Sequence, residues 1–158
     1  MGRQRSWKLN GQFGRLALAL LFSLTLARSA GAETVAQTVR KWGLIGPWAL
    51  DCSLKPGRDQ NAVLDYEIAD DGRVLYRRNF GDASDENEVV SAELARDGLL
   101  NLRVYFPSLR QTREYGLMLQ PDGTMRAIYN RTLKDEYTIR DGRFVGDGKP
   151  TPSHHRCK

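Results

Sequence analysis

The stretch WGLIGPWALDC, residues 42–52, decides how the chain enters its fold. It holds two tryptophans, Trp42 and Trp48, separated by two glycines and a proline, and it ends in a cysteine. Residues 34–42 before it place apolar side chains at i, i+4 and i+7, which predicts a short N-terminal helix. The Gly-Pro pair at 46–47 interrupts any helical path, so we expect the first β-strand to follow directly.

Beyond residue 52, turn signals alternate with β-rich runs. Four Asp-Gly pairs each separate two such runs, and Asp-Gly is a strong signal for a tight hairpin turn. Within the runs, apolar and polar residues alternate, as they do in a sheet with one buried and one wet face. The predicted strands are 47–53, 62–69, 73–80, 86–96, 99–106, 111–120, 124–132 and 135–140, with a candidate ninth at 143–145.

These runs predict an all-β domain over residues 33–145, followed by a Gly/Pro-rich tail over 146–158. About eight sequential antiparallel strands joined by tight turns favour an up-and-down meander that closes as a barrel, because closure removes the two free edges. A sandwich of two sheets requires the same alternation and remains the alternative.

The same alternation assigns large side chains to the interior. Arg78 is an exception in its run: it lies at every second position with apolar residues on either side, so the alternation places this charged side chain on the apolar face. So many large inward residues argue that much of the barrel interior is filled. They are Tyr66, Tyr76, Phe80, Phe106, Tyr115 and Tyr129.

Residues 1–32 have the composition of a secretory signal peptide. Four basic residues precede an uncharged, mostly apolar run at 16–27, and Ala30-Gly31-Ala32 supplies the small residues of a cleavage site. A helix of that run spans ~18 Å, short of the ~30 Å hydrocarbon core, although an uncleaved anchor stays the alternative. We therefore expect cleavage after Ala32, a periplasmic or secreted protein, and no stable membrane insertion afterwards.

The net charge of +5 belongs to this N-terminal segment. Residues 1–32 hold five of the 24 basic residues and none of the acidic ones, which leaves 19 basic against 19 acidic residues. A neutral domain lacks the basic face that nucleic-acid binding requires. We expect no nucleic-acid partner, and we expect a monomer.

Two cysteines, Cys52 and Cys157, remain after the segment is removed. In an oxidising compartment such a pair forms a disulfide. The chain-entropy model gives ~4–5 kcal/mol for a loop of about 100 residues. The bridge would tether the tail to the first strand. Two free thiols, or a metal site in which Cys157 joins His154 and His155, are the alternatives. Zinc requires four ligands and no second cluster exists, so we expect no metal and no cofactor.

Residues suited to catalysis are scarce. The only two histidines lie in the tail, and no serine sits in a Gly-x-Ser-x-Gly turn. Conceivable carboxylate pairs lie on the polar sides of their strands, where burial would not raise a pKa. The acidic segment 82–88 is expected to be a solvated loop, with a calcium site as the alternative. We therefore expect a non-enzymatic protein.

Gly46-Pro47-Trp48, which opens a meander after a short helix, resembles the Gly-x-Trp start of lipocalin and avidin-type barrels. The resemblance makes the expected barrel lipocalin-like. It implies that Trp48 closes the barrel floor and that an arginine from a late strand packs over it. The candidates at this end are Trp42, Trp48, Arg131 and Arg140. A bridge from the C-terminal tail back to the barrel is similar as well.

Two further resemblances bear on function. Small periplasmic inhibitors of secreted metalloproteases are similar in length, in an early Gly-x-Trp and in having a single disulfide, which implies that residues 33–40 form a trunk that enters a protease cleft. The motif of residues 42–53 together with Phe80-Gly81-Asp82 resembles uncharacterised exported proteins of soil and root-nodule proteobacteria. That likeness implies export and supplies no activity.

The sequence thus predicts an exported small β-barrel that binds a ligand and catalyses nothing. Its expected partner is a small apolar molecule held inside the barrel. A protein-interaction module that acts through its ends and loops, such as a periplasmic protease inhibitor, is the alternative.

Overall fold

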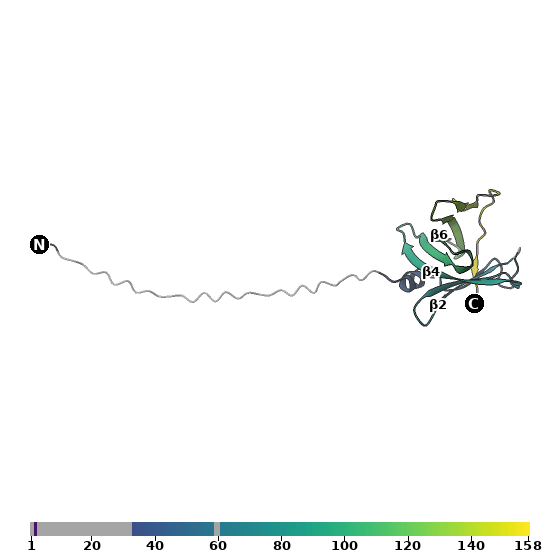
Figure 1. Cartoon of the computed structure of the whole chain (residues 1–158), viewed down its shortest axis with the longest axis horizontal. Helices are drawn as coiled ribbons and strands as arrows, with labels where there is room; N and C mark the ends of the chain where they lie inside the picture. Colours follow the sequence, from purple (N-terminus) through teal and green to yellow (C-terminus); the bar gives the residue numbers. More distant parts are fainter. Residues whose placement is uncertain (1, 3–32, 59–60) are drawn as a thin grey trace. The chain divides into compact units, whose positions relative to one another are not determined.

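The computed structural model describes residue 2, residues 33–58 and residues 61–158 (Figure 1). The predicted signal peptide, residues 1–32, lies outside the described residues except for Gly2. The unit Ala32–Lys158 is compact by itself, and all described helices and strands belong to it. They are α1 (Val35–Trp42), β1 (Gly46–Ala49), β2 (Val63–Ile68), β3 (Val74–Asn79), β4 (Ser84–Leu94), β5 (Leu100–Phe106), the 3-10 helix η1 (Pro107–Leu109), β6 (Gln111–Leu119), β7 (Met125–Thr132), β8 (Tyr137–Arg140), β9 (Arg143–Phe144) and β10 (His155–Arg156).

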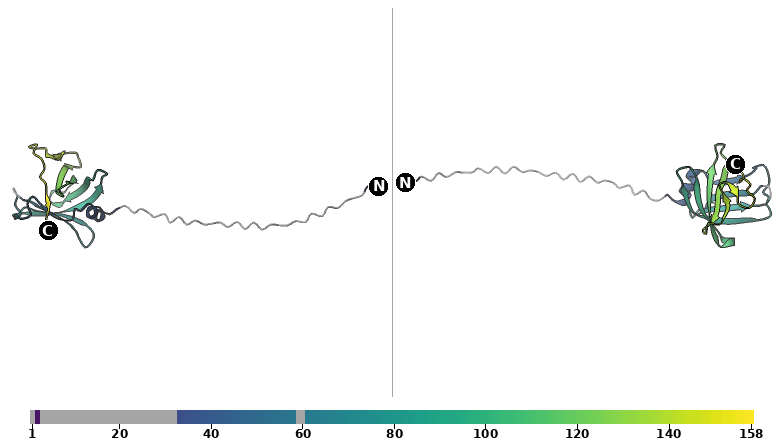
Figure 2. Two further views of the ribbon diagram at one scale, coloured as in Figure 1. Left: turned by 180° about the vertical axis from the view of Figure 1, so that it is seen from behind. Right: turned by 90° about the horizontal axis from the view of Figure 1, so that it is seen from above.

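The strands form one antiparallel sheet in the order β10-β1-β2-β3-β4-β5-β6-β7-β8-β9. The sheet curls into a half-barrel (Figures 1 and 2). The predicted all-β meander is confirmed, and the two-sheet sandwich does not form. Instead of about eight strands, the described part of the chain has ten: the candidate ninth strand forms as β9, and the tail adds the two-residue strand β10.

The first strand is shorter than predicted and ends at Ala49 rather than at residue 53. Asp51 stops it, because its carboxylate accepts hydrogen bonds from the backbone and the hydroxyl of Ser53. Asn61 holds the same turn: its amide oxygen accepts from the Asp51 backbone, and its amide nitrogen donates to the carbonyl groups of Asp51 and Leu54. Side-chain hydrogen bonds of this kind compete with a strand ladder.

The acidic segment at 82–88 is mostly strand, which corrects the expectation of a solvated loop. Ser84 begins β4, and the register places Asp85 opposite Arg78 and Glu86 opposite Arg77. Opposite charges directly across an antiparallel pair attract each other, so these acidic residues fit a strand beside basic β3.

Helix α1 begins and ends as its sequence predicts. Thr34 and Gln37 form a capping box, and Gly43 ends the helix with a φ of 89°, a conformation that favours glycine. The helix contacts β4 and buries Val39 and Trp42. The Trp42 indole donates a hydrogen bond of 2.9 Å to the carbonyl of Gly98, in the β4–β5 turn.

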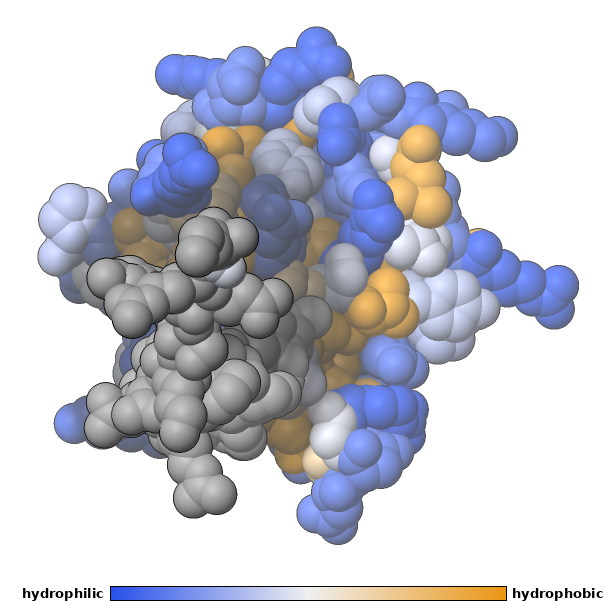
Figure 3. Space-filling view, turned by 90° about the vertical axis from the view of Figure 1, so that its left-hand side faces the viewer, coloured by the Kyte–Doolittle hydropathy of each residue, from blue (hydrophilic) through white to orange (hydrophobic). Residues whose placement is uncertain are grey.

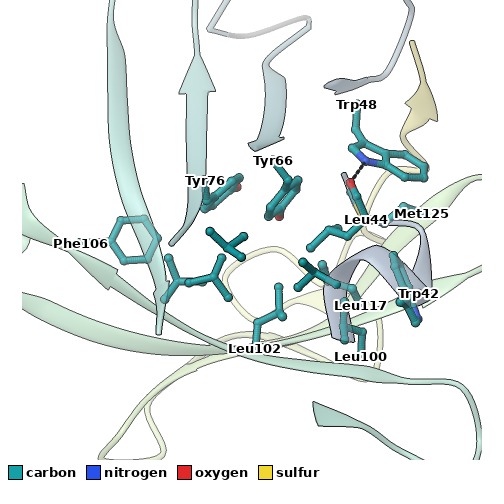
Figure 4. Packing of buried hydrophobic residues seen from close by; sticks show 14 residues of the cluster. Trp42, Leu44, Trp48, Tyr66, Tyr76, Leu100, Leu102, Phe106, Leu117 and Met125 are labelled. Carbon is teal, nitrogen blue, oxygen red and sulfur yellow. Dashed lines mark hydrogen bonds between the residues drawn. The ribbon is translucent and has the colours of Figure 1, made fainter. Parts of the chain in front are cut away.

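The main core lies beside α1, at one end of the curled sheet (Figure 4). Trp48 is only 2% exposed, and its indole donates to the carbonyl of Leu44 at 2.7 Å. Burying each large apolar side chain contributes ~1.5–3 kcal/mol. The apolar side chains around it come from the helix, the following loop and most long strands; they include Val39, Leu44, Leu100, Leu102, Leu117 and Met125.

The C-terminal tail is paired along its length rather than tethered at its end alone. Thr151 donates its backbone N–H to Gly142, His154 bridges to Met125 in β7, and β10 pairs with β1. The disulfide between Cys52 and Cys157 is present, with a Cα–Cα distance of 5.4 Å. The tail therefore connects the last strands of the meander to β1. Its strand β10 is the yellow strand beside the C-terminus in Figure 1.

The disulfide points to an oxidising, non-cytoplasmic location, because structural disulfides persist in such compartments. Among the described residues, no helix has the length and apolar character needed to cross a membrane.

Candidate functional site

A cavity of about 490 Å³ lies between the concave face of the sheet and the C-terminal tail. Strands β2, β3, β6, β7 and β8 supply much of its wall, and Thr151, Pro152 and His154 of the tail supply another part. Cavities of this size hold small-molecule ligands in many proteins. The curl of the sheet and the pairing of the tail thus leave a partly open space that the inward side chains do not fill.

Aromatic side chains form one wall of the cavity. The rings of Tyr66 and Tyr76 stack with centroids 4.6 Å apart, and Phe106 lies edge-on to Tyr76 at a centroid distance of 6.5 Å (Figure 4). Tyr115 lies edge-on to Tyr76 at 6.4 Å. Burial raises the pKa of Tyr66, Tyr76 and Tyr115. Their hydroxyl groups are therefore protonated at neutral pH.

The cavity wall contains one partly buried cation, Arg78 of β3. Its guanidinium lies 4.9 Å from the ring centroid of Phe106 and 5.5 Å from that of Phe80. Its Nε donates to Asp85 at 2.9 Å, and its Nη2 pairs with the same carboxylate. Two rings and one carboxylate therefore hold the guanidinium in place.

The ion pair between Arg78 and Asp85 outweighs the effect of partial burial on the pKa of both residues. Burial by itself would raise the pKa of Asp85, but hydrogen bonds from Arg78 and Asn87 lower it. Burial would lower the pKa of Arg78, but the hydrogen bond with Asp85 raises it. Both groups are therefore charged at neutral pH.

A second arginine, Arg58, stands at the edge of the cavity. Its guanidinium lies 5.9 Å from the ring centroid of Phe80, and its Nη2 is 3.7 Å from Asp82. Phe80 thus contacts two guanidinium groups, one exposed and one partly buried. This end of the cavity is polar and cationic.

The opposite part of the cavity is apolar and adjoins the core. Leu117 and Met125 belong both to the cavity lining and to the core cluster, and Ala127 and Ile139 continue the lining. In Figure 4, Leu117 and Met125 lie near Trp42, whereas Phe106, the partner of Arg78, lies on the far side of the cluster. The cavity therefore runs from a cationic end to an apolar end.

The tail places a histidine against the cavity. Met125 and His154 exchange backbone hydrogen bonds of 2.9 Å in both directions. Burial lowers the pKa of His154, because a low-dielectric environment disfavours the imidazolium form. The imidazole is therefore neutral at neutral pH.

The structure separates the four residues that the sequence proposed for the barrel floor. Trp42 and Trp48 lie in the core beside α1, outside the cavity lining. Arg131 pairs with Glu114 and Asp135, each at 2.7 Å, and Arg140 lies 4.1 Å from the ring centroid of Tyr137.

Neither Arg131 nor Arg140 is the arginine that faces the strand of Trp48. That position belongs to Arg156 of β10, which is in register with Trp48 and donates through Nη2 to the carbonyl of Ile45 at 2.6 Å. Sequence analysis missed Arg156 because it did not predict β10.

Two further residues lie elsewhere than the sequence indicated. Tyr129, expected inside, lies on the outer face, where its hydroxyl donates to Asn101 at 2.7 Å. The register of the β6–β7 pair shifts beside Gly116. Because Gly116 has no Cβ, the Tyr129 ring can lie against it. His154 was grouped with His155 as a metal-ligating tail, yet Cys157 is bridged and His154 alone lines the cavity. The position of Arg78 among the inward-facing residues of its run was the one sequence signal for the cationic end of the cavity.

No family model matches the chain, and the searches of curated proteins and of solved structures found no match. The chemistry of the cavity therefore carries the functional argument.

Proposed function

We propose that this protein binds a small, largely apolar molecule in the cavity between the half-barrel and its tail, and that it acts as a carrier or binding protein rather than as an enzyme. One observation carries the proposal: a cavity of about 490 Å³ stays open inside a sheet whose other inward side chains pack tightly. An apolar lining with a few convergent polar groups is typical of ligand sites.

The construction of the wall supports this proposal. Most lining residues stand on paired strands, and paired strands hold side chains in fixed positions better than free loops do. The tail completes the wall through hydrogen bonds and the disulfide. A preformed site binds with a smaller loss of conformational entropy.

The place of action that fits best is outside the cytoplasm. The disulfide requires oxidation of two cysteines, and the composition of residues 1–32 is typical of a segment that directs export. We therefore include export, to the periplasm or to the medium, in the proposal.

The helix argues against the inhibitor alternative. A trunk formed by residues 33–40 would have to leave the domain and enter a protease cleft. Residues 35–42 instead form α1, Val39 is fully buried, and Trp42 is hydrogen-bonded to the β4–β5 turn. Extracting this helix would expose the core, so a binding role for the cavity is favoured.

A titration with a neutral fluorescent probe, N-phenyl-1-naphthylamine, tests the proposal on purified residues 33–158. The variant Ala127→Phe fills the cavity, because Ala127 lines it. Its neighbour Ile128 lies on the outer side, so Ile128→Phe is the matched control.

We expect saturable one-to-one binding that Ala127→Phe weakens about tenfold or more and Ile128→Phe leaves within about twofold. Thermal unfolding verifies that both variants fold, and Ala127→Val provides a milder step if the phenylalanine does not fit. Equal binding by the folded filled and control variants, or the absence of saturable binding in the parent protein, would overturn the proposal.

A further inference from the structure

We propose that the ligand is an amphipathic anion whose carboxylate is bound by Arg78, assisted by Arg58, at the Phe80 end of the cavity, while its apolar part extends toward Leu117 and Met125. This inference rests on the proposed function and specifies the chemical class of the ligand.

The first argument is the sign of the charges that line the cavity. Its charged side chains in the described part of the chain are Arg58 and Arg78, and no aspartate or glutamate is among the lining residues. The carboxylates that pair with these arginines, Asp82 and Asp85, stand outside the lining. The charged side chains of the lining itself are therefore positive, and Asp85 balances part of that charge through its ion pair with Arg78.

The second argument is the supply of hydrogen-bond donors. Burial keeps the hydroxyl groups of Tyr76 and Tyr115 protonated. The positive charge of Arg78 lowers and the negative charge of Asp85 raises the pKa of both phenols, so this ion pair and the two hydroxyl groups lie within electrostatic reach of one another. Two phenol donors and a guanidinium suit an acceptor with several lone pairs, and a carboxylate has about four.

The third argument is the geometry of Arg78 itself. Asp85 occupies its Nε and Nη2, whereas Nη1 has no acceptor within the described ranges 33–58 and 61–158. The side chain is 26% exposed, so it is mostly removed from water but remains reachable. Contacts with Phe80 and Phe106 hold the guanidinium plane, which reduces the entropy lost when an anion binds.

The fourth argument is the polarity gradient along the cavity. Arg78 lies two residues after Tyr76 in β3, toward the β3–β4 turn. The Phe80 ring contacts both Arg78 and Arg58, and these three residues form the polar end of the cavity. Leu117 and Met125 form the other end, against the core. A molecule with one anionic group and one apolar chain matches both ends at once.

Two probes that differ only in their polar group test the inference: decanoate and 1-decanol. Each is titrated against the neutral fluorescent probe in the parent protein and in the variants. The double variant Arg78→Gln/Asp85→Asn removes both charges of the ion pair, so that no unpaired charge remains to unfold the strand. The exposed Arg58→Gln is a second, milder variant. Arg77→Gln is the matched control, because Arg77 pairs with Glu67 and Glu86 on the surface.

We expect the parent protein to bind decanoate about tenfold or more tightly than 1-decanol. The double variant should lose that preference and keep its affinity for 1-decanol within about threefold, Arg58→Gln should reduce the preference, and Arg77→Gln should preserve it. Equal affinity of the parent protein for both probes, or an undiminished preference in the folded double variant, would overturn the inference and leave the proposed function standing. If neither these probes nor the neutral fluorescent probe binds saturably, both fail.

Discussion

Met125, the first residue of β7, and His154, in the C-terminal tail, exchange two backbone hydrogen bonds of 2.9 Å. This pairing turns the last residues of the chain into part of the cavity wall. It also joins the tail to the sheet just before β10 pairs with β1 and the disulfide fixes the end of the chain. The proposed ligand site therefore depends on the tail as much as on the meander.

Removing the disulfide should weaken both the fold and the site. The double variant Cys52→Ser/Cys157→Ser frees a loop with a sequence separation of 105. We expect the free energy of unfolding, measured by denaturant titration, to fall by about 2–5 kcal/mol. Probe affinity should fall several-fold as well, because Thr151, Pro152 and His154 lose a constraint on their position.

The reduced parent protein serves as the control for this prediction, because it lacks the same bond without any substitution. If the folded double variant kept the full probe affinity, the tail would not be needed to form the cavity wall.

His154 should make stability depend on pH. Its pKa is lowered in the folded state because the side chain is buried, whereas an exposed histidine in the unfolded chain titrates near ~6.5. Between these two pKa values the unfolded state binds more protons, so the free energy of unfolding falls as the pH drops below about 7.

The variant His154→Gln should flatten that dependence, whereas the matched variant His155→Gln, at an exposed position, should retain it. Unfolding curves collected at pH values from about 7.5 to about 5 provide the comparison. A decline that persists unchanged in His154→Gln would assign the pH dependence to other groups.

Gly116→Ala should destabilise the β6–β7 pair. A Cβ at this position would lie 2.2 Å from Cε1 of Tyr129, so the ring would have to move and would lose its hydrogen bond to Asn101. We expect a loss of about 1–3 kcal/mol in the free energy of unfolding. Gly146→Ala is the control, because a Cβ there would meet no atom within 4 Å. Equal stability of the two variants would mean that Tyr129 shifts without cost.

Trp48→Phe should destabilise the core through the loss of both a hydrogen bond and ring volume. The substitution keeps an aromatic ring and removes the N–H that donates to the carbonyl of Leu44 at 2.7 Å. Leaving that acceptor unpaired costs about 1–3 kcal/mol, in addition to the lost ring volume. A comparison with Trp42→Phe, whose bond to Gly98 lies nearer the surface, should show the smaller loss for Trp42 in denaturant titrations.

Much of this fold could be predicted because its signals are local. Asp-Gly turns and alternating polarity predicted the meander, and the apolar spacing over residues 34–42 predicted α1. The predicted pairing of Cys52 and Cys157 is confirmed. The strand β10 escaped prediction because two residues show no periodicity, and their pairing with β1 depends on tertiary contacts alone.

The candidate site was harder to predict for the same reason. Arg78 stood out by its parity, but its role depends on Phe106 and Asp85, which come from other strands. The bulge beside Gly116 reversed the side on which Tyr129 lies, and no sequence pattern marks a register shift. His154 and its neighbour have the same residue type, so only the pairing with Met125 identifies the one that lines the cavity.

A hollow on the outer surface, lined by residues such as Arg103, Glu114 and Arg131, is more polar than the cavity. The described face in Figure 3 shows hydrophilic side chains around its edge and hydrophobic residues between them. Large exposed apolar side chains such as Leu54, Leu109 and Leu133 are far apart in the sequence and lie in turns, bends or the 3-10 helix η1. Single exposed apolar residues are ordinary on protein surfaces.

Native mass spectrometry of the protein purified without denaturation from the cells that make it tests the central claim most directly. We expect a fraction of molecules to retain one small amphipathic anion, at a stoichiometry of one per chain. Ala127→Phe should lose this added mass, whereas Ile128→Phe should keep it. A parent protein that carries no added mass and that takes up none when decanoate is supplied would contradict the claim that the half-barrel and its tail enclose a ligand site.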